Sequence, residues 1–193
     1  MQGPALAMIE FKTVAEGILA TDALVKKAKV DLIYAHPVTP GKYMVLFGGN
    51  VAEVEEARTA GLNAKKDSVI HELFLPQVHP DVLPVLKGQK KIVIDGPIAI
   101  IETTTVAGTV LAADIAAKAT PIELCEMRLA RYLGGKGYVL FTGELADVQA
   151  SLQAATEYAR ETGVLAASEI IENPHPEMLE KAVYWKGLHH EIS

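Results

Sequence analysis

The sequence has a single cysteine, Cys125, among its 193 residues. One cysteine cannot form a disulfide within the chain, a Cys-x-x-Cys motif or an all-cysteine zinc site, so we expect a protein of the reduced cytosol. Long apolar runs are also missing, because no stretch approaches the roughly 20 residues of a membrane-spanning helix. Residues 1–7 lack the cationic start and apolar core of a signal peptide. The sequence therefore predicts neither secretion nor a membrane partner.

An excess of basic residues is absent as well. The chain carries 18 Lys and Arg against 24 Asp and Glu, and the formal net charge of -6 is spread along its length. A basic patch or stripe is the usual footprint of a surface that binds nucleic acid, so no nucleic-acid partner is expected. What the chain does have is hydrophobic residues, which make up 50% of the sequence. That is enough for one medium domain or two small domains with a core each.

The chain repeats itself in three ordered blocks. ALAMIEFKTVAEGILATDALVKKA matches PIAIIETTTVAGTVLAADIAAKAT, which sets Glu10 over Glu102 at a spacing of 92 residues. GKYMVLFGGNVAEV matches GKGYVLFTGELADV at a spacing of 94, so the second copy has gained two residues just ahead of a loop. VHPDVL matches PHPEML at a spacing of 96, which sets His79 over His175. An internal duplication of this kind predicts two similar structural units.

The runs rich in β-formers in the first copy predict four strands. They cover residues 6–11, 30–35, 42–47 and 68–75. Thr13 stands where a helix N-cap would, before a helix ending near Ala28, and Asn50 is placed similarly before a helix reaching toward Gly61. A short last helix is predicted from Pro80 to just before Gly88.

The predicted order is βαββαβ followed by a small helix, which is the split βαβ, ferredoxin-like arrangement with helices on one face of a sheet. The second copy repeats this order over about residues 98–183, and the polar segment 87–96 joins the copies. We therefore predict an α/β (α+β) chain of two tandem ferredoxin-like domains. The expected boundaries are 1–91 for the first domain, 92–185 for the second and 186–193 for a C-terminal tail.

The segment LAMIEFKTVAEGILATDALVKKAKVDLI, followed by a PGK loop, VAEVEEA and HP, resembles the bacterial microcompartment shell domain. The match covers nearly all of both copies. Their unpermuted order resembles the single-layer tandem shell proteins of the propanediol-utilisation type. The resemblance implies a homotrimer whose six domains imitate a hexamer, forming flat tiles of the polyhedral shell inside the cytoplasm. It implies a structural protein without enzymatic activity, with other shell proteins and the encapsulated enzymes as partners.

In this family the loops nearest the threefold axis line a central pore that passes small metabolites. The matching residues here are Val38, Thr39, Pro40, Gly41, Leu133, Gly134 and Gly135. Glycine allows the backbone to approach the axis, and a ring of Thr39 hydroxyl groups would favour polar metabolites. Without the resemblance, an ordinary hairpin loop is the commoner interpretation of such Gly and Pro residues.

Some relatives hold an iron-sulfur cluster on the axis through a cysteine of the first pore loop, but the matching position here is Thr39. A hydroxyl is a poor iron ligand compared with a thiolate, so we predict no cluster. We also predict no other cofactor and no metal. Cys125 falls in a predicted strand, where a buried and inert thiol is the commoner role.

By the resemblance, Lys26 and Lys118 lie at the tile edge and align neighbouring tiles. As isolated residues they would be solvated surface charges. The arginine of the Pro-Arg-Pro-His edge motif of the family is replaced by Gln77 in the first copy and Asn173 in the second. We therefore expect altered edge contacts.

His79 and His175 each precede a proline at the start of the last helix of a copy. Imidazole can bond to local backbone groups there, so we assign both to edge structure and neither to catalysis. Glu10 and Glu102 could suggest a pair of carboxylates for acid-base chemistry. Their matching positions in one strand of each copy favour a repeated structural or interface role.

Two other functions stay open from the sequence. A small-molecule-binding regulatory protein with tandem ferredoxin-like domains would share the fold and the glycine-rich loops. An enzyme has less support, because no Ser/His/Asp or Cys/His arrangement can be singled out.

Overall fold

The computed structural model describes residues 5–90, 93–130 and 133–180. Its first half contains β1 (Ala5–Phe11), α1 (Val14–Lys27), β2 (Asp31–Val38), β3 (Lys42–Gly49), α2 (Val51–Ala64), a 3-10 turn (Lys66–Ser68), β4 (Val69–Leu75) and α3 (Val82–Leu86). Its second half contains β5 (Ile98–Thr103), α4 (Val106–Ala119), β6 (Glu123–Leu129), β7 (Gly137–Thr142), α5 (Leu145–Glu161), β8 (Leu165–Ile171) and α6 (Pro176–Met178). The predicted order βαββαβ with a small last helix is confirmed in both halves.

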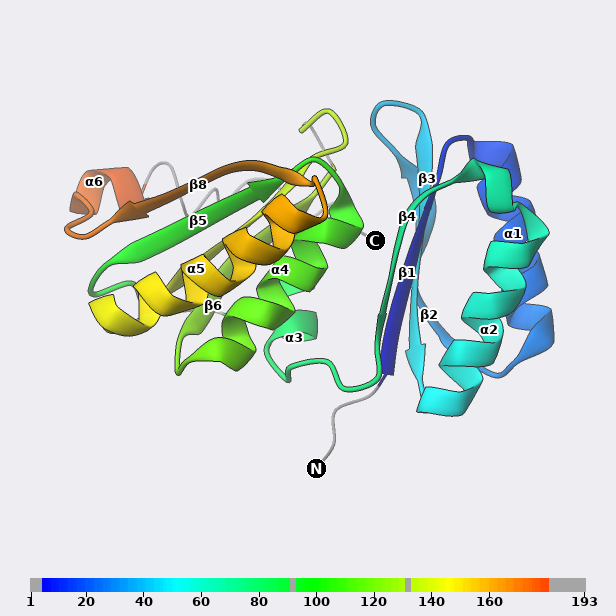
Figure 1. The fold of residues 1–193 in the computed structure, drawn as a ribbon, viewed down its shortest axis with the longest axis horizontal. Helices are drawn as coiled ribbons and strands as arrows, with labels where there is room; N and C mark the ends of the chain where they lie inside the picture. The colour runs from blue at the N-terminus through cyan, green and yellow to red at the C-terminus, as the bar shows by residue number, and fades with distance from the viewer. Residues whose placement is uncertain (1–4, 91–92, 131–132, 181–193) are drawn as a thin grey trace.

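Each half forms a four-stranded antiparallel sheet, in the orders β2-β3-β1-β4 and β6-β7-β5-β8. Two long helices cover one face of each sheet, α1 and α2 in the first half and α4 and α5 in the second (Figure 1). This is the strand order of the ferredoxin-like α+β fold that the element order predicts.

Strand register confirms the duplication at the three spacings seen in the sequence. Phe11 pairs with Tyr43 and Val69 in the first sheet, and Thr103 pairs with Gly137 and Leu165 in the second. The two extra residues lie in the hairpin loop itself. Five residues, 38–42, separate the paired residues Pro37 and Tyr43, whereas seven residues, 130–136, separate the matching pair Leu129 and Gly137. Residues 131 and 132 lie outside the described part of the chain.

The predicted helix caps are present. The Thr13 hydroxyl accepts from the Glu16 N–H at 3.4 Å, and the Asn50 side chain accepts from the Glu53 N–H at 3.0 Å. Helix α2 differs from the prediction because it continues past Gly61 to Ala64. A Cβ atom at Gly61 would lie 3.1 Å from a methyl group of Ile9, so this glycine allows close helix packing and does not end the helix.

The hydrophobic residues form two main clusters. One lies between the first sheet and its own helices and includes Phe11, Phe47 and Leu24. The larger cluster joins the second-half core to the opposite face of the first sheet. The first sheet is therefore covered on both faces, by its own helices on one and by the second half on the other, which the sequence did not predict.

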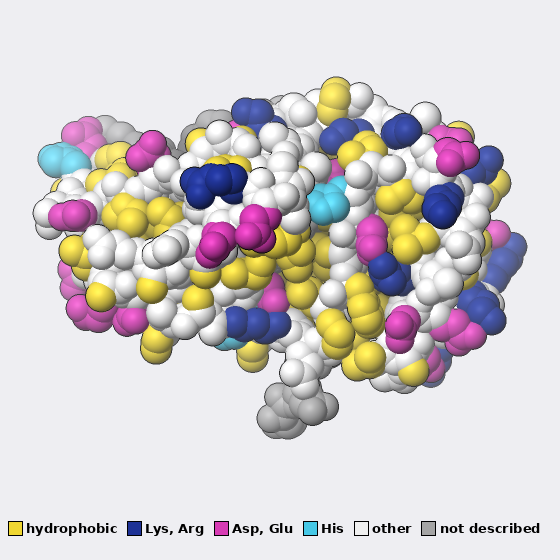
Figure 2. Space-filling model, in the orientation of Figure 1, with side chains coloured by type: hydrophobic (Ala, Val, Ile, Leu, Met, Phe, Trp, Pro, Cys, Tyr) yellow, Lys and Arg dark blue, Asp and Glu magenta, His cyan; other side chains and the backbone are white. Residues whose placement is uncertain are grey.

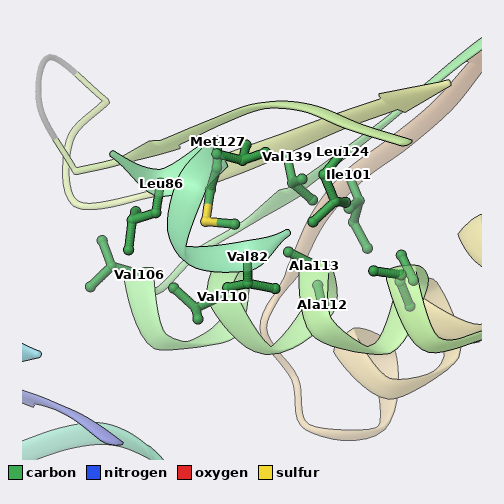
Figure 3. Packing of buried hydrophobic residues seen from close by; sticks show 14 of the residues in the cluster. Val82, Leu86, Ile101, Val106, Val110, Ala112, Ala113, Leu124, Met127 and Val139 are labelled. Atoms are coloured by element: carbon green, nitrogen blue, oxygen red, sulfur yellow. The ribbon is translucent and has the colours of Figure 1, made fainter. Parts of the chain in front are cut away.

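Helix α3 follows the first copy in sequence but packs with the second half. Val82 and Leu86 lie among Val106 and Val110 of α4 and Met127 of β6 (Figure 3). All five side chains are buried, with exposed fractions of 7% or less. This packing ties the two halves together, because α3 connects directly to the last strand of the first sheet.

Candidate functional site at the junction of the halves

The two halves meet along a junction whose centre is apolar. The outer face of the first sheet contributes Leu6, Met8 and Leu73, and α4 faces it with Val106 and Val110. Figure 2 shows hydrophobic side chains gathered along this seam, whereas acidic and basic side chains are interspersed over the rest of the view without a large patch of one sign. The junction has the character of a protein core, and we treat it together with its polar ends and the adjoining loops as the candidate site.

Glu10 lies fully buried at the end of the junction that contains the first turn of α4. One carboxylate oxygen, Oε1, accepts the N–H of Ala107 at 2.7 Å, in the first turn of α4. The ammonium group of Lys42 lies 3.8 Å from the other oxygen, Oε2. Removal from water raises the pKa of Glu10 to about 7, although the Ala107 N–H and Lys42 both favour the ionised form. Glu10 is therefore an interface residue, in agreement with the structural role expected for it.

His71 lies beside Glu10 on the neighbouring strand and adds a second polar contact across the junction. Its Nδ1 atom lies 2.7 Å from the hydroxyl oxygen of Thr105, the N-cap residue of α4. Burial lowers the pKa of His71. The first turn of α4 is thus bonded to two adjacent strands of the first sheet, through Glu10 on β1 and His71 on β4.

The opposite end of the junction, beside the C-terminal half of α4, brings together three of the residues expected at the tile edge. The ammonium group of Lys118 donates to the Gln77 carbonyl oxygen at 2.5 Å and to Asp114 at 2.6 Å. The His79 N–H donates to the other Asp114 oxygen at 2.7 Å. Asp114 is 2% exposed and was not among the predicted site residues. Its match to Asp22 in the repeat was the available signal, since a carboxylate kept in both copies indicates a shared contact.

The matching residues of the other copy are not brought together within one chain. Lys26 pairs with Asp22 at 2.6 Å on the exposed surface of α1, and Asn173 and His175 are exposed after β8. The His175 imidazole accepts the Glu177 N–H at 3.2 Å, as the His79 imidazole accepts that of Asp81 at 3.3 Å. Both histidines therefore bond to local backbone, as expected.

The two loops expected to line a pore lie against each other. Thr39, Pro40 and Gly41 are exposed, and a Cβ atom on Gly135 would lie 2.9 Å from the Thr39 carbonyl oxygen. Gly135 has a φ of 86°, which favours glycine, and this permits the close approach. The adjoining Gly134 is exposed and Leu133 is half-buried.

Val38 differs from its loop neighbours. It ends β2, is 8% exposed and belongs to the large hydrophobic cluster. Its side chain therefore packs inward, and only its backbone adjoins the loop.

Cys125 lies in β6, and its thiol contacts the Glu123 carbonyl oxygen at 3.3 Å. Burial raises the pKa of Cys125 to about 12, with the Glu123 carboxylate adding to the effect. A thiol with such a pKa is a poor nucleophile at neutral pH. Within the described residues, no cluster of three or more His, Cys, Asp or Glu side chains has the arrangement of a metal site. None of the described helices combines the length and apolar character needed to cross a bilayer.

Comparison with known families places both halves in one family. The model of the BMC domain matches residues 5–78 and 98–174. The chain is 34% identical over 179 residues to the bacterial microcompartment shell protein PduT of Citrobacter freundii, covering 93% of this chain and 97% of PduT. It is also 34% identical over 90 residues to the shell protein PduA of Salmonella typhimurium, covering 45% of this chain and 94% of PduA. PduA thus matches about one copy of the repeat.

Solved structures agree with these relationships. The crystal structure of a microcompartments protein from Desulfitobacterium hafniense DCB superposes with a TM-score of 0.83 at 38% identity, covering 92% of this chain and 99% of that chain. A fused permuted hexameric shell protein from the RMM microcompartment superposes with a TM-score of 0.63 at 22% identity, covering 82% and 85% of the two chains. The second likeness is evidence for the fold alone.

Proposed function

Because the chain belongs to the BMC-domain family of bacterial microcompartment shell proteins, we propose that three copies of it close into a pseudohexameric tile around a central pore. Its role in the shell is structural, since the relatives are shell proteins and not enzymes. Shell proteins of this family oligomerise with other shell proteins, which are the partners of this chain.

The observation that carries the trimer proposal is a difference in exposure between matching residues of the two copies. Ile18 in α1 is 54% exposed, whereas its counterpart Val110 in α4 is fully buried at the junction. Leu32 in β2 is 44% exposed, whereas its counterpart Leu124 in β6 is fully buried in the cluster that includes α3. The first copy thus leaves open the same surface that the junction covers in the second copy.

The second sheet supplies the complementary surface. Leu73 and Leu75 on the outer face of β4 are buried, but their counterparts Glu169 and Ile171 on β8 are exposed. Each chain therefore carries one complete junction and the two unmatched halves of another. Unmatched halves at opposite ends of a chain favour head-to-tail association, which closes into a ring when the rotation between units divides a full turn.

The contacts that Asp114 and Lys118 make within the chain can be repeated between chains by their counterparts in the first copy. Asp22 and Lys26 of one protomer would take the places of Asp114 and Lys118, and would meet Asn173 and His175 of the partner subunit. The side chains of Lys26 and Lys118 are 73% and 45% exposed, which also leaves them accessible to a neighbouring tile. We assign the tile-edge role to these lysines on that basis, with Gln77 and His79 beside Lys118.

The adjoining loops 39–41 and 133–135 are the proposed pore lining. Their contact through Gly135 and Thr39 supports a shared rim, because it brings the hairpin ends of both halves to one place. Three Thr39 hydroxyl groups and the backbone amides of the glycines would offer hydrogen bonds to small polar metabolites. The encapsulated enzymes are proposed as further partners of the tile.

Two measurements on the full chain test this function. Sedimentation velocity is expected to give about three times the chain mass of 20.7 kDa. Electron microscopy at high protein concentration is expected to show flat arrays, tubes or closed shells. A chain that stays monomeric at every concentration tested contradicts the proposal.

A further inference from the structure

We propose that the ring is closed by the carboxylate of Glu102, which caps the first turn of α1 in the next protomer by accepting the N–H of Ala15 of the partner subunit. This inference rests on the trimer proposed above and names the polar contact on which its closure depends.

The structure contains one example of this contact within the chain. Glu10 reaches from β1 across the junction and accepts the Ala107 N–H at 2.7 Å, two residues after the N-cap of α4. The first N–H groups of a helix have no acceptor within the helix, and the partial positive charge of a helix start favours a carboxylate. A buried helix start needs such an acceptor, because an unpaired N–H in a dry interface is costly.

Glu102 and Ala15 are the counterparts of Glu10 and Ala107 at the repeat spacing of 92 residues. Glu102 faces outward from β5 in the register that Glu10 has in β1, and its carboxylate lies 2.9 Å from the ammonium group of Lys136. Lys136 matches Lys42, the lysine beside Glu10. The acceptor and its neighbouring cation are therefore both repeated.

Ala15 is exposed, whereas Ala107 is fully buried. Ala15 lies two residues after Thr13, the N-cap of α1, whose hydroxyl serves the Glu16 N–H. The Ala15 N–H therefore stays available to a group from outside the helix. The small side chain of alanine lets a neighbouring strand approach the backbone, as it does at Ala107.

The hydrogen bond between the Ala107 N–H and Glu10 needs an acceptor oxygen on the side chain and does not need a full negative charge. The pKa of Glu10 is raised to about 7 at the buried contact, so the neutral form competes there, and its carbonyl oxygen can still accept the N–H. A glutamine at position 102 would keep an acceptor oxygen in the same place, whereas an alanine would remove it.

The test compares E102A, E102Q and a control, E157A, in the full chain. Glu157 is exposed on α5, on the helix side of the second sheet, and its loss should leave the trimer unchanged. Loss of a helix cap weakens a contact about fivefold, so the three junctions of a trimer give about a hundredfold higher trimer dissociation constant for E102A. E102Q is expected within about threefold of the wild type, and sedimentation equilibrium over a concentration series measures all four proteins.

Hydrogen exchange at the Ala15 amide provides a second readout. It should be protected in the wild-type trimer and in E102Q, and exposed in E102A. A trimeric E102A with wild-type dissociation and exchange overturns the inference. Equal weakening by E102Q and E102A also overturns it, because the ionised charge beside Lys136 would then be the essential feature. A wild-type chain that never forms trimers refutes the tile itself, which is a separate result.

Discussion

The Glu10 carboxylate lies in a dry junction, and two opposing effects act on its ionisation. Desolvation disfavours the ionised form, while the start of α4 and the Lys42 ammonium group favour it. Desolvation is the larger effect, because the side chain is fully buried and the lysine is 3.8 Å away. Stability of the chain should therefore depend on pH through this residue.

Replacing Glu10 with glutamine tests that dependence. An unfolded glutamate titrates near pH 4.5, and the folded one near pH 7, so the folded state binds more protons between these values. The contribution of Glu10 to the free energy of unfolding therefore falls by roughly 3 kcal/mol as the pH rises from about 4.5 to 7. E10Q should lack this fall, as measured by urea unfolding at a series of pH values.

His71 contributes the opposite trend, because its lowered pKa makes the unfolded state bind more protons below about pH 6.5. The difference between E10Q and wild type separates the two groups. A difference that does not change between pH 5 and 7 would show that Glu10 keeps an ordinary pKa.

The two glycines of the second loop should respond differently to alanine. Gly135 has a φ of 86°, and a Cβ atom there would lie 2.9 Å from the Thr39 carbonyl oxygen. Gly134 has a φ of 61° with no atom within 4 Å of the added Cβ. We expect G134A to lower the free energy of unfolding by about 1 kcal/mol and G135A by about 2 to 3 kcal/mol. Urea unfolding measures both, and equal losses would contradict the contact between the loops.

At the scale of elements, α1 and α4 are the same helix in two environments. Each has 14 residues, begins after a threonine N-cap and packs on its own sheet. The outer surface of α4 is covered by the first sheet, and that of α1 is open. A substitution on the outer surface of α1 should therefore affect the association of chains, whereas the matching substitution in α4 should affect the folding of a single chain.

We expect Ile18→Glu to abolish the trimer and leave the chain folded, because Ile18 is exposed in a single chain and would be buried only between chains. Val110→Glu should destabilise the chain by about 4 kcal/mol or more, because it places a charge in a formed core. Sedimentation and circular dichroism distinguish these results. A trimeric I18E protein would remove α1 from the proposed interface.

Most elements could be predicted from local pattern. The N-caps Thr13 and Asn50 and the β-rich runs gave the positions of the strands and long helices to within a few residues. The end of α2 could not be predicted, because Gly61 is a usual helix terminator in sequence but here faces Ile9 and Leu24. The packing of α3 against the second half could not be predicted either, because its apolar residues do not indicate which of the two cores they join.

At the scale of the whole molecule, the duplication gives the proposed association of copies a head-to-tail direction. One junction is formed inside the chain, and in the proposed trimer the remaining two half-junctions would be covered by other copies of the chain. Sequence differences between the copies would then make the junctions within chains differ from the junctions between chains in the proposed ring. His71, which bonds Thr105 in the junction within the chain, is matched by Ala167 in the second copy, so the proposed contacts between chains would lack this bond.

The sequence by itself determined the duplication, the fold of each half, the family resemblance and the pairing of residues between copies. Those features are local or repeated, and they can be recognised without knowing which surfaces touch. Only the tertiary structure decided that Glu10, Asp114 and α3 belong to one junction, and that Val38 packs inward. The physical reason is that burial depends on contacts between residues far apart in the chain, so matching residues such as Ile18 and Val110 can have opposite exposures.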